Sequence, residues 1–509
     1  MQWLDSITEK LIARQPEGEI LIESGGSPSG TYHFGHLREV VICDAIMLEL
    51  QRKGREARHV YFADDLDAFR KVPKNMPADY EKYLGIPLCD IPAPDGSNKS
   101  YADFHIDSLI KACEDLHIEV EFIYSHTKYR TGFFVPAIER CAENFSQIKD
   151  ILEEVSNREL PDGWTPIQVM DNGRLKNRKF VSINTEDKTL NYLDAKDETK
   201  SVQYDKGEVK MDWRLDWPGR WWLMEVAVEP FGREHASAGG SYDTGVRIMK
   251  DIYEAEAPLA VAYDSVHMTG DTKKMSASKG TALSAEEGLE VLPSEVIRYF
   301  MLRSVLNRPI YFDPVNGVVQ LLDDFAALSA KKERSESEEQ LCYVCTRGIE
   351  KTISRVPFSL LVASYQAALK DVDLTLSIIA RTEYSEVVNE ESDLIRSELR
   401  FIDTWLEKYA PESVKFALVD KVDPGEFSEK DKEFLNKLAD KISSAPDDAD
   451  GAWFHKAIYD YKDELDMQPK EMFSVLYKVL INKSSGPRAG WFLSILPRNW
   501  LISRLRFEV

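Results

Sequence analysis

Hydrophobic and polar positions follow two different periods along the first 70 residues, and together they predict a strand, a helix and a second strand. A short apolar run, "EILIES", begins at Glu19. The stretch "LREVVICDAIMLELQRKG" then places apolar residues at helical spacing and ends at Gly54. A second apolar run, "ARHVYFADD", ends in acidic residues. This strand–helix–strand order is typical of a parallel, nucleotide-binding sheet.

The same order recurs later in the chain, which predicts a sheet built from two halves. "WLMEVAVEPFG", "GSYDTGVRIMKDIYE" and "PLAVAYDSVHM" read as a strand, a helix and a strand. The second part of the stretch between the halves alternates like short strands with turns, and helices rich in Glu, Lys and Ser follow from about residue 330. We predict an α/β fold with a Rossmann-type parallel sheet, a mixed α/β insertion and an all-α C-terminal domain. The predicted ranges are 1–70 and 213–275 for the sheet domain, 71–212 for the insertion, 276–330 for a connecting domain and 331–509 for the helical domain.

Composition narrows the class of protein further. At 509 residues, 43% of them hydrophobic, the chain is long enough for several domains with large cores. A net charge of −23 argues against binding nucleic acid through bulk charge, so any such surface must be a local groove. There is no signal-like segment and no apolar run of membrane-spanning length, and the six cysteines do not resemble a disulfide framework. We expect a cytoplasmic protein without membrane contact.

The first motif lies at the turn after the first strand, in "SPSGTYHFGHLRE". A glycine-rich turn that leads into a helix N-terminus is suited to anions, because backbone N–H groups and the helix dipole face the ligand. His33 and His36 stand one turn apart there and could donate hydrogen bonds to phosphate oxygens. The alternative is that one histidine caps the helix and the other packs.

The second motif, "GDTKKMSASKGTALS", follows the last strand of the second half. Lys274 and Lys279, with Ser276 and Ser278, would suit a triphosphate and its leaving pyrophosphate. On its own this stretch could equally be a solvated surface loop.

Together, the two motifs resemble the "HIGH" and "KMSKS" signatures of class I aminoacyl-tRNA synthetases. The sequence around the two motifs resembles the class I lysyl-tRNA synthetases over nearly the whole chain. The segments that carry this resemblance include "SGGSPSGTYHFGHLREVV", "FADDLDAFRKVP", "WRLDWPGRW", "VEPFGREHASAGGSYDTG" and "RPIYFDP". This resemblance implies a Rossmann catalytic domain with an insertion and a helical cage that reads the tRNA anticodon.

The resemblance also implies the reaction. Lysine and ATP, accompanied by Mg²⁺, would give lysyl-adenylate and pyrophosphate, and the 2′-OH of the terminal adenosine of tRNA(Lys) would accept the lysyl group. His33, His36, Lys274 and Lys279 would be catalytic. The ATP-binding positions would be Ser29, Gly35, Glu234, Gly239, Gly240, Met275, Ser276 and Ser278.

For the L-lysine pocket, the resemblance points to Gly25, Ser27, Trp213 and His235, with Tyr263 as a further candidate. The acids of "FADDLDAF" follow a strand's C-terminal end, where such sheets bind ligands. Asp65 or Asp67 is favoured for an amino group of lysine, while helix capping is the alternative for each acid. Most of the tryptophans in "WRLDWPGRWW" are expected in the core.

The chain departs from the family in three respects. Glu234 stands where the family usually has Asp, and Ala277 replaces the fourth residue of the KMSKS signature. The insertion has no CxxC pair, so we expect no structural zinc and no other metal site; the pair in "CYVC", Cys342 and Cys345, is expected in the core.

Two basic stretches are candidates for tRNA contact. The first, in the insertion, contains Arg174, Lys176, Arg178 and Lys179, and the second contains Arg488 and Trp491. The alternative for the second is the rim of a packed helix bundle. Two other functions stay open: a paralogue that transfers lysine to an acceptor other than tRNA, and a non-catalytic binding protein. We expect a monomer.

Overall fold

The computed structural model describes residues 1–73, 76–157, 159–161, 163–270, 283–446 and 449–509. The chain forms two compact units. The first comprises Met1–Leu289, Ile297–Phe312 and Arg334–Gly348, and the second comprises Glu290–Val296, Asp313–Glu333 and Ile349–Val509.

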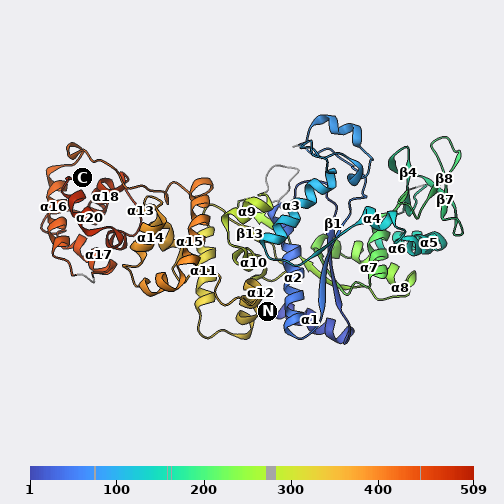
Figure 1. Cartoon of the computed structure of the whole chain (residues 1–509), viewed down its shortest axis with the longest axis horizontal. Coiled ribbons are helices and arrows are strands. Elements are labelled where there is room, and N and C mark those ends of the chain that lie inside the picture. The colour runs from blue at the N-terminus through green and yellow to red at the C-terminus, as the bar shows by residue number, and fades with distance from the viewer. Residues whose placement is uncertain (74–75, 158, 162, 271–282, 447–448) are drawn as a thin grey trace. The chain divides into compact units, whose positions relative to one another are not determined.

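A five-stranded parallel sheet organises the first unit, with the order β11-β10-β1-β2-β3. Its central strand, β1, is labelled in Figure 1. Its strands are β1 (Ile20–Gly26), β2 (Ala57–Ala63), β3 (Glu121–Tyr124), β10 (Val228–Gly232) and β11 (Leu259–Tyr263). The first crossover is α2 (Leu37–Arg52), which is buried along most of its length as its apolar sequence requires. The predicted α/β fold with a Rossmann-type parallel sheet is confirmed.

Two boundaries in the second half differ from the prediction. Residues from Trp222 to Met224 end a helix, α7 (Trp213–Met224), and β10 begins only at Val228. Glu225 closes α7 in the left-handed region at φ 56°, which stops the helix before the strand. The run predicted as one strand over "PLAVAYDSVHM" divides into β11 and β12 (Val266–Met268), because β12 pairs with β13 (Ile310–Phe312) instead.

The stretch between the two halves is mixed, and it returns to the main sheet once, as β3. Its helices are α3 (Tyr101–Asp115), α4 (Ser125–Arg130), α5 (Val135–Glu143) and α6 (Phe145–Ser156). Its other strands form two small antiparallel sheets: β4 (Ile167–Asp171), β5 (Arg174–Asn177) and β9 (Val209–Met211) in one, and β6 (Lys179–Asn184), β7 (Thr189–Leu193) and β8 (Thr199–Gln203) in the other.

The remaining helices that contribute to the first unit are α1 (Gln2–Arg14), α8 (Ser241–Asp251), α9 (Ala285–Val291), α10 (Ser294–Leu302) and α12 (Glu336–Thr346). Cys342 and Cys345 are both buried in α12, as predicted for a core pair. None of the described helices is long and apolar enough to cross a membrane.

The second unit is helical, as the sequence predicts for this part of the chain. Its helices are α11 (Val318–Ala330), α13 (Phe358–Ala367), α14 (Val372–Ile379), α15 (Ser385–Lys408), α16 (Glu429–Ser443), α17 (Gly451–Tyr459), α18 (Pro469–Ile481), α19 (Ala489–Ile495) and α20 (Arg498–Leu505). Apolar side chains from α13, α14 and the last five of these helices form one core, with Phe434, Leu476 and Phe492 fully buried.

Candidate active site

The turn that carries His33 and His36 is a short 3₁₀ segment, Phe34–His36, directly before α2. Phe34 is fully buried against Phe300 and Phe312, which anchors the turn. The two imidazoles stack with their centroids 3.7 Å apart, and the His33 backbone N–H donates to His36 Nδ1 at 2.9 Å. One nitrogen of His36 therefore closes the turn, which is part of the capping role that the sequence left open.

A cavity of about 240 Å³ opens beside this turn, over the C-terminal ends of the strands. Parallel sheets bind ligands at this edge. Seven residues predicted for the site meet here: Gly25, Ser27, His33, Gly35, His36, Glu234 and Tyr263. The remaining lining residues are Gly26, Tyr32, Glu39, Tyr61, Leu109, Gly232, Ser265 and Val266.

Glu39 is a cavity residue that sequence reasoning missed. The backbone N–H of Gly25 donates to its Oε1 at 3.1 Å, and the Tyr263 hydroxyl donates to its Oε2 at 2.5 Å. Burial raises the pKa of Glu39 to about 7, although both hydrogen bonds act to lower it. The signal was present in the sequence: Glu39 lies three residues after His36, which is the N-cap of α2, so the first turn of the helix brings Glu39 close to the histidine turn.

Gly25 is required by close packing. A Cβ atom at this position would lie 2.6 Å from the carbonyl oxygen of Phe62 on the neighbouring strand. The absence of a side chain lets the Gly25 N–H reach Glu39, which links the first strand to α2 at the cavity wall.

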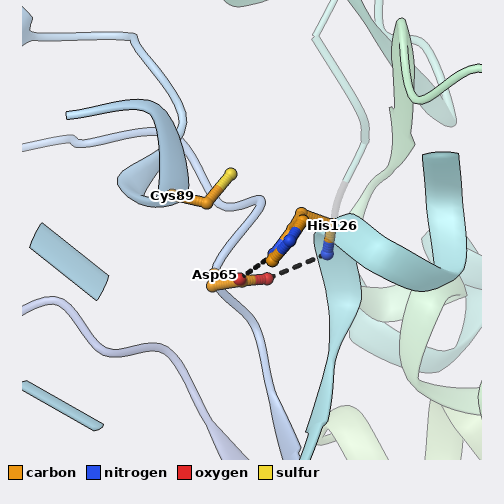
Figure 2. A group of neighbouring side chains, drawn as sticks. All are labelled: Asp65, Cys89 and His126. Carbon is orange, nitrogen blue, oxygen red and sulfur yellow. Dashed lines mark hydrogen bonds and ion pairs between the residues drawn. The ribbon is translucent and has the colours of Figure 1, made fainter. Parts of the chain in front are cut away.

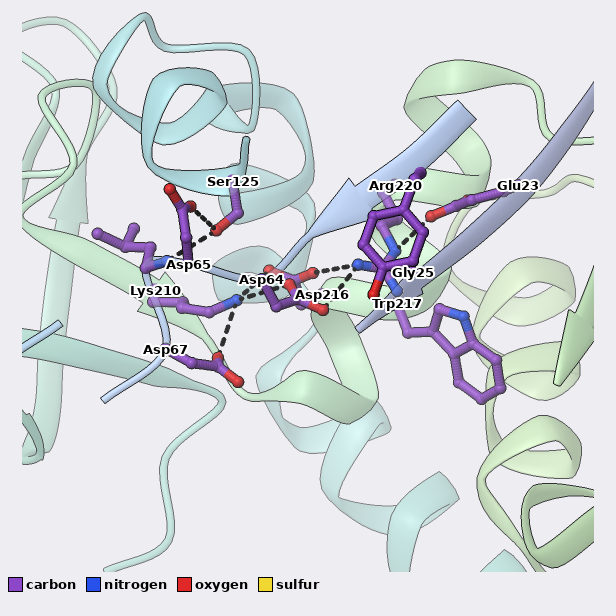
Figure 3. A network of polar contacts seen from close by, with 12 residues as sticks. Glu23, Gly25, Asp64, Asp65, Asp67, Ser125, Lys210, Asp216, Trp217 and Arg220 are labelled. Atoms are coloured by element: carbon purple, nitrogen blue, oxygen red, sulfur yellow. Dashed lines mark hydrogen bonds and ion pairs between the residues drawn. The ribbon is translucent and has the colours of Figure 1, made fainter. Parts of the chain in front are cut away.

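The acids of "FADDLDAF" are Asp64, Asp65 and Asp67, and none of them is among the described residues that line this cavity. They make buried polar contacts elsewhere (Figure 3). Lys210 Nζ lies 3.5 Å from the carboxylates of both Asp64 and Asp67. Asp65 is fully buried and accepts from Ser125 Oγ at 3.0 Å and from the His126 N–H at 2.8 Å. Asp65 therefore caps α4, the alternative that the sequence analysis left open, and Asp67 faces a lysine of the protein itself.

Two buried cations hold this network together. Lys210 also lies 2.9 Å from Asp216, and Arg220 lies 2.7 Å from Glu23 and 3.0 Å from Asp64. Burial disfavours the charged form of Lys210, yet the surrounding carboxylates hold its pKa above the ordinary value. Burial likewise opposes ionisation of Asp64, but Arg220 and Lys210 hold its pKa below the ordinary value.

The tryptophans of α7 mostly belong to the core, as predicted. Trp217 Nε1 donates to the buried Glu229 at 2.7 Å, and Trp221 Nε1 donates to the same carboxylate. Burial raises the pKa of Glu229 to about 7. Trp213 and His235 meet edge to face with ring centroids 6.0 Å apart, and neither is among the described residues that line the cavity.

The two glycines of "ASAGGS" lie in close contact with the protein's own backbone. Gly239 adopts φ +73°, and a Cβ there would lie 2.6 Å from the Val155 carbonyl oxygen. A Cβ at Gly240 would lie 2.6 Å from the Ser237 carbonyl oxygen. At Ser29, the backbone oxygen accepts from the Tyr101 hydroxyl at 2.9 Å, which fixes the loop before the histidines. Lys274, Met275, Ser276, Ser278 and Lys279 lie outside the described residues.

The basic stretch of the insertion is largely bonded within the protein. Arg174 donates to the Lys82 carbonyl oxygen at 2.7 Å, and Arg178 donates to Asp171 at 2.6 Å. Lys176 lies 3.7 Å from Asp171, whereas Lys179 is exposed. In the second unit, Arg488 precedes α19 and Trp491 packs against the helical core, in agreement with the alternative of a bundle rim.

Comparison with known proteins identifies the family. The family described as tRNA synthetases class I (K) matches residues 1–346. The chain is 36% identical to a lysine–tRNA ligase of Archaeoglobus fulgidus over 99% of each chain. It is also 34% identical to lysine–tRNA ligase 1 of Methanosarcina acetivorans, over 99% of this chain and 98% of that protein. The chain therefore belongs to the class I (K) family of tRNA synthetases, which confirms the resemblance to class I lysyl-tRNA synthetases drawn from its motifs.

Proposed function

We propose that this protein attaches L-lysine to tRNA(Lys) in two steps. The lysine carboxylate attacks the α-phosphorus of ATP, its oxygen forms the new P–O bond, and pyrophosphate leaves. The 2′-OH of the terminal adenosine then attacks the lysyl carbonyl and releases AMP. Full-length similarity to lysine–tRNA ligases supports this reaction.

The observation that carries the choice of amino acid is the carboxyl of Glu39 in the cavity wall. A specific site for an ε-ammonium must replace its water with hydrogen-bond acceptors. Glu39 meets this need because its carboxyl lies at the cavity and is oriented by Gly25 and Tyr263. We assign the ε-ammonium to Glu39 and propose that Gly25, Ser27 and Tyr263 complete the pocket.

We assign His33 and His36 to the ATP phosphates, where they would donate hydrogen bonds as negative charge develops. Their position beside the cavity and before α2 supports this role. Within the same proposal, Lys274 and Lys279 bind the leaving pyrophosphate, and Glu234, which also lines the cavity, accepts from the ribose hydroxyls. Trp213 and His235 would bound the pocket only if they moved toward the ligand.

The remaining expectations belong to this proposal. Mg²⁺ would enter with ATP as part of the substrate, and the enzyme would act as a monomer in the cytoplasm. The exposed Lys179 is the basic residue of the insertion that we assign to tRNA, together with Arg488 and Trp491 of the second unit.

The test is ATP–pyrophosphate exchange with each of the twenty amino acids, with and without bulk tRNA. We expect exchange with lysine alone, and 2′-aminoacylated tRNA when tRNA(Lys) is present. Exchange with another amino acid would overturn the pocket assignment. Lysine-dependent exchange without any tRNA charging would favour the paralogue with another acceptor, and no exchange in either condition would favour a binding protein.

The histidine roles have a matched control in the same chain. His33→Ala and His36→Ala are each expected to slow exchange by about 10²–10³-fold. His117→Asn changes an exposed histidine in the left-handed region, which asparagine tolerates, and should leave the rate unchanged. Equal effects of all three substitutions would contradict the assignment.

A further inference from the structure

Three side chains that are far apart in the sequence meet beside the end of β2. Asp65 lies in the loop after β2, Cys89 lies in a 3₁₀ turn (Leu88–Asp90), and His126 lies in the first turn of α4. A carboxylate oxygen, a thiol sulfur and an imidazole nitrogen from these residues all lie within 4.8 Å of one another (Figure 2). None of these three residues lines the cavity of the candidate active site, and the group does not depend on a CxxC pair, which the insertion lacks.

The backbone fixes the position of these groups. The Cys89 N–H donates to the Asp65 carbonyl oxygen at 2.9 Å, which holds the 3₁₀ turn against the loop. One carboxylate oxygen of Asp65 accepts from Ser125 Oγ and from the His126 N–H, which fixes the plane of the carboxylate. The other oxygen faces His126 Nδ1 directly. Asp65 and His126 are therefore preorganised, with Cys89 beside them.

The imidazole has a partner on its other side as well. His126 Nε2 lies 3.1 Å from Thr127 Oγ1. Histidines that bind metals usually have such a second partner, because it sets the tautomer and the orientation of the ring. The side chain of Asp65 is only 1% exposed and that of His126 is 27% exposed, so the group is buried on one side and open to solvent on the other.

The donor set points to one class of ion. Thiolate, imidazole and carboxylate together are the ligands of Zn²⁺, while Mg²⁺ and Ca²⁺ prefer oxygen ligands alone. Zinc–ligand bonds of about 2.0–2.3 Å place the ligand atoms of a tetrahedral site roughly 3.3–3.8 Å apart. The three ligand atoms already lie within 4.8 Å of one another. A bound ion would move the Asp65 oxygen and His126 Nδ1 apart, because they are hydrogen-bonded to each other, and would draw the Cys89 sulfur toward them.

One neighbouring cation competes with a metal at this position. Arg130 Nη2 lies 3.8 Å from Cys89 Sγ, but the same nitrogen is 2.8 Å from Asp90. The Asp90 carboxylate pairs with this guanidinium. A bound metal would replace the long contact between Arg130 and the Cys89 sulfur, and Arg130 would keep its pairing with Asp90.

We propose that Asp65, Cys89 and His126 form a zinc site, with one further position open to water. The ion binds as Zn²⁺, displaces the thiol proton of Cys89 and takes the Nδ1 lone pair of His126, whose one remaining proton is then on Nε2, facing Thr127 Oγ1. It joins three segments at the edge of the sheet. Three protein ligands leave this site more open than a four-ligand structural site.

The test uses the full-length protein after treatment with a chelator, with Co²⁺ and Zn²⁺ as the probes. One Co²⁺ per chain should produce a thiolate-to-cobalt charge-transfer absorption in the near ultraviolet, and Zn²⁺ should remove it. Cys89→Ser should abolish this absorption, and His126→Asn should weaken Co²⁺ binding roughly tenfold or more. Cys113→Ser, which alters a buried cysteine of α3, is the matched control and should retain it.

A second measurement needs no variant. Alkylation of Cys89, located by mass spectrometry, should slow when Zn²⁺ is added to the wild-type protein. A cobalt complex without thiolate absorption, an absorption that survives Cys89→Ser, or alkylation of Cys89 that ignores Zn²⁺ would each overturn the proposal.

Discussion

Two groups of acids lie near the same edge of one sheet, yet they differ in what faces them. Asp64, Asp67 and Asp216 face the buried cation of Lys210, with Arg220 beside them. Glu39 faces a backbone N–H and a tyrosine hydroxyl, which carry no charge. The carboxylates of the first group are paired with cations of the protein, whereas Glu39 has uncharged donors as its hydrogen-bond partners.

This difference explains why strand-end acids are poor guides to a substrate pocket. Buried carboxylates and cations compensate each other only when both are held close, and removal of one partner leaves an expensive unpaired charge. A carboxylate that serves a cationic substrate must instead lack an internal cation. The comparison therefore separates residues that hold the sheet edge together from Glu39, the residue that we propose for binding the substrate ammonium.

The largest effect should come from the compensated group. Lys210→Met leaves three carboxylates around an uncharged side chain, and we expect a loss of about 3–5 kcal/mol in the free energy of unfolding, measured by urea denaturation. Lys206→Met removes an exposed lysine paired with Asp205 and should change stability by less than about 0.5 kcal/mol. A Lys210→Met protein that is as stable as the wild type but activates a different amino acid would contradict the structural role of Lys210.

Glu39→Gln should act on the ligand and leave stability intact. We expect kcat/KM for lysine in the exchange reaction to fall about 10- to 150-fold, which corresponds to a charged hydrogen bond of about 1.5–3 kcal/mol. The KM for ATP should not change. Glu225→Gln, at an exposed helix end, is the control; the same lysine defect in both variants would exclude a special role for Glu39.

The pH dependence of lysine binding tests the same role of Glu39. The lysine ammonium requires ionised Glu39, whose pKa is about 7 in the folded protein. Apparent lysine affinity should therefore rise about tenfold per pH unit up to pH 7 and level off above it. Steady-state KM against pH measures this slope, and its persistence in Glu39→Gln would assign it to another group.

The contribution of Glu39 to the free energy of unfolding changes with pH in the opposite direction to lysine affinity: it falls as pH rises. Its pKa is raised from 4.5 by burial, so the folded state holds the proton more tightly than the unfolded state does. Stability from this group is present below pH 4.5 and is lost as pH rises through about 7.

The smallest effect is expected at Tyr263. Tyr263→Phe removes the hydroxyl that donates to Glu39 but leaves the carboxylate in place, and a typical intramolecular hydrogen bond contributes about 0.5–1.5 kcal/mol. We expect lysine KM to rise about two- to tenfold with kcat nearly unchanged, measured by pyrophosphate exchange. An effect larger than that of Glu39→Gln would show that the tyrosine contacts the substrate by itself.

The sequence predicted the fold well where the signal is local. The apolar residues of β1, α2 and β2 recur with the period of a strand or a helix within each segment. Apolar and polar residues alternate in the second part of the insertion, where the structure has short strands. The prediction failed at Trp222–Met224, because an apolar run of three residues fits a helix end as well as a strand. It also missed β3, a short strand that is recognised as such only by its pairing with β2.

For the site, the sequence by itself determined the turn with His33 and His36, because an HxGH motif after a strand is local in the chain. The family resemblance pointed to Gly25 and Ser27, and Tyr263 was a further candidate; the structure brings all three to the cavity. Only the tertiary structure decided which acids are compensated, since Lys210 comes to Asp64 from almost 150 residues away. The tertiary structure also brings together Asp65, Cys89 and His126. They lie on three segments that are far apart in the chain, so no motif with a regular spacing indicates the group.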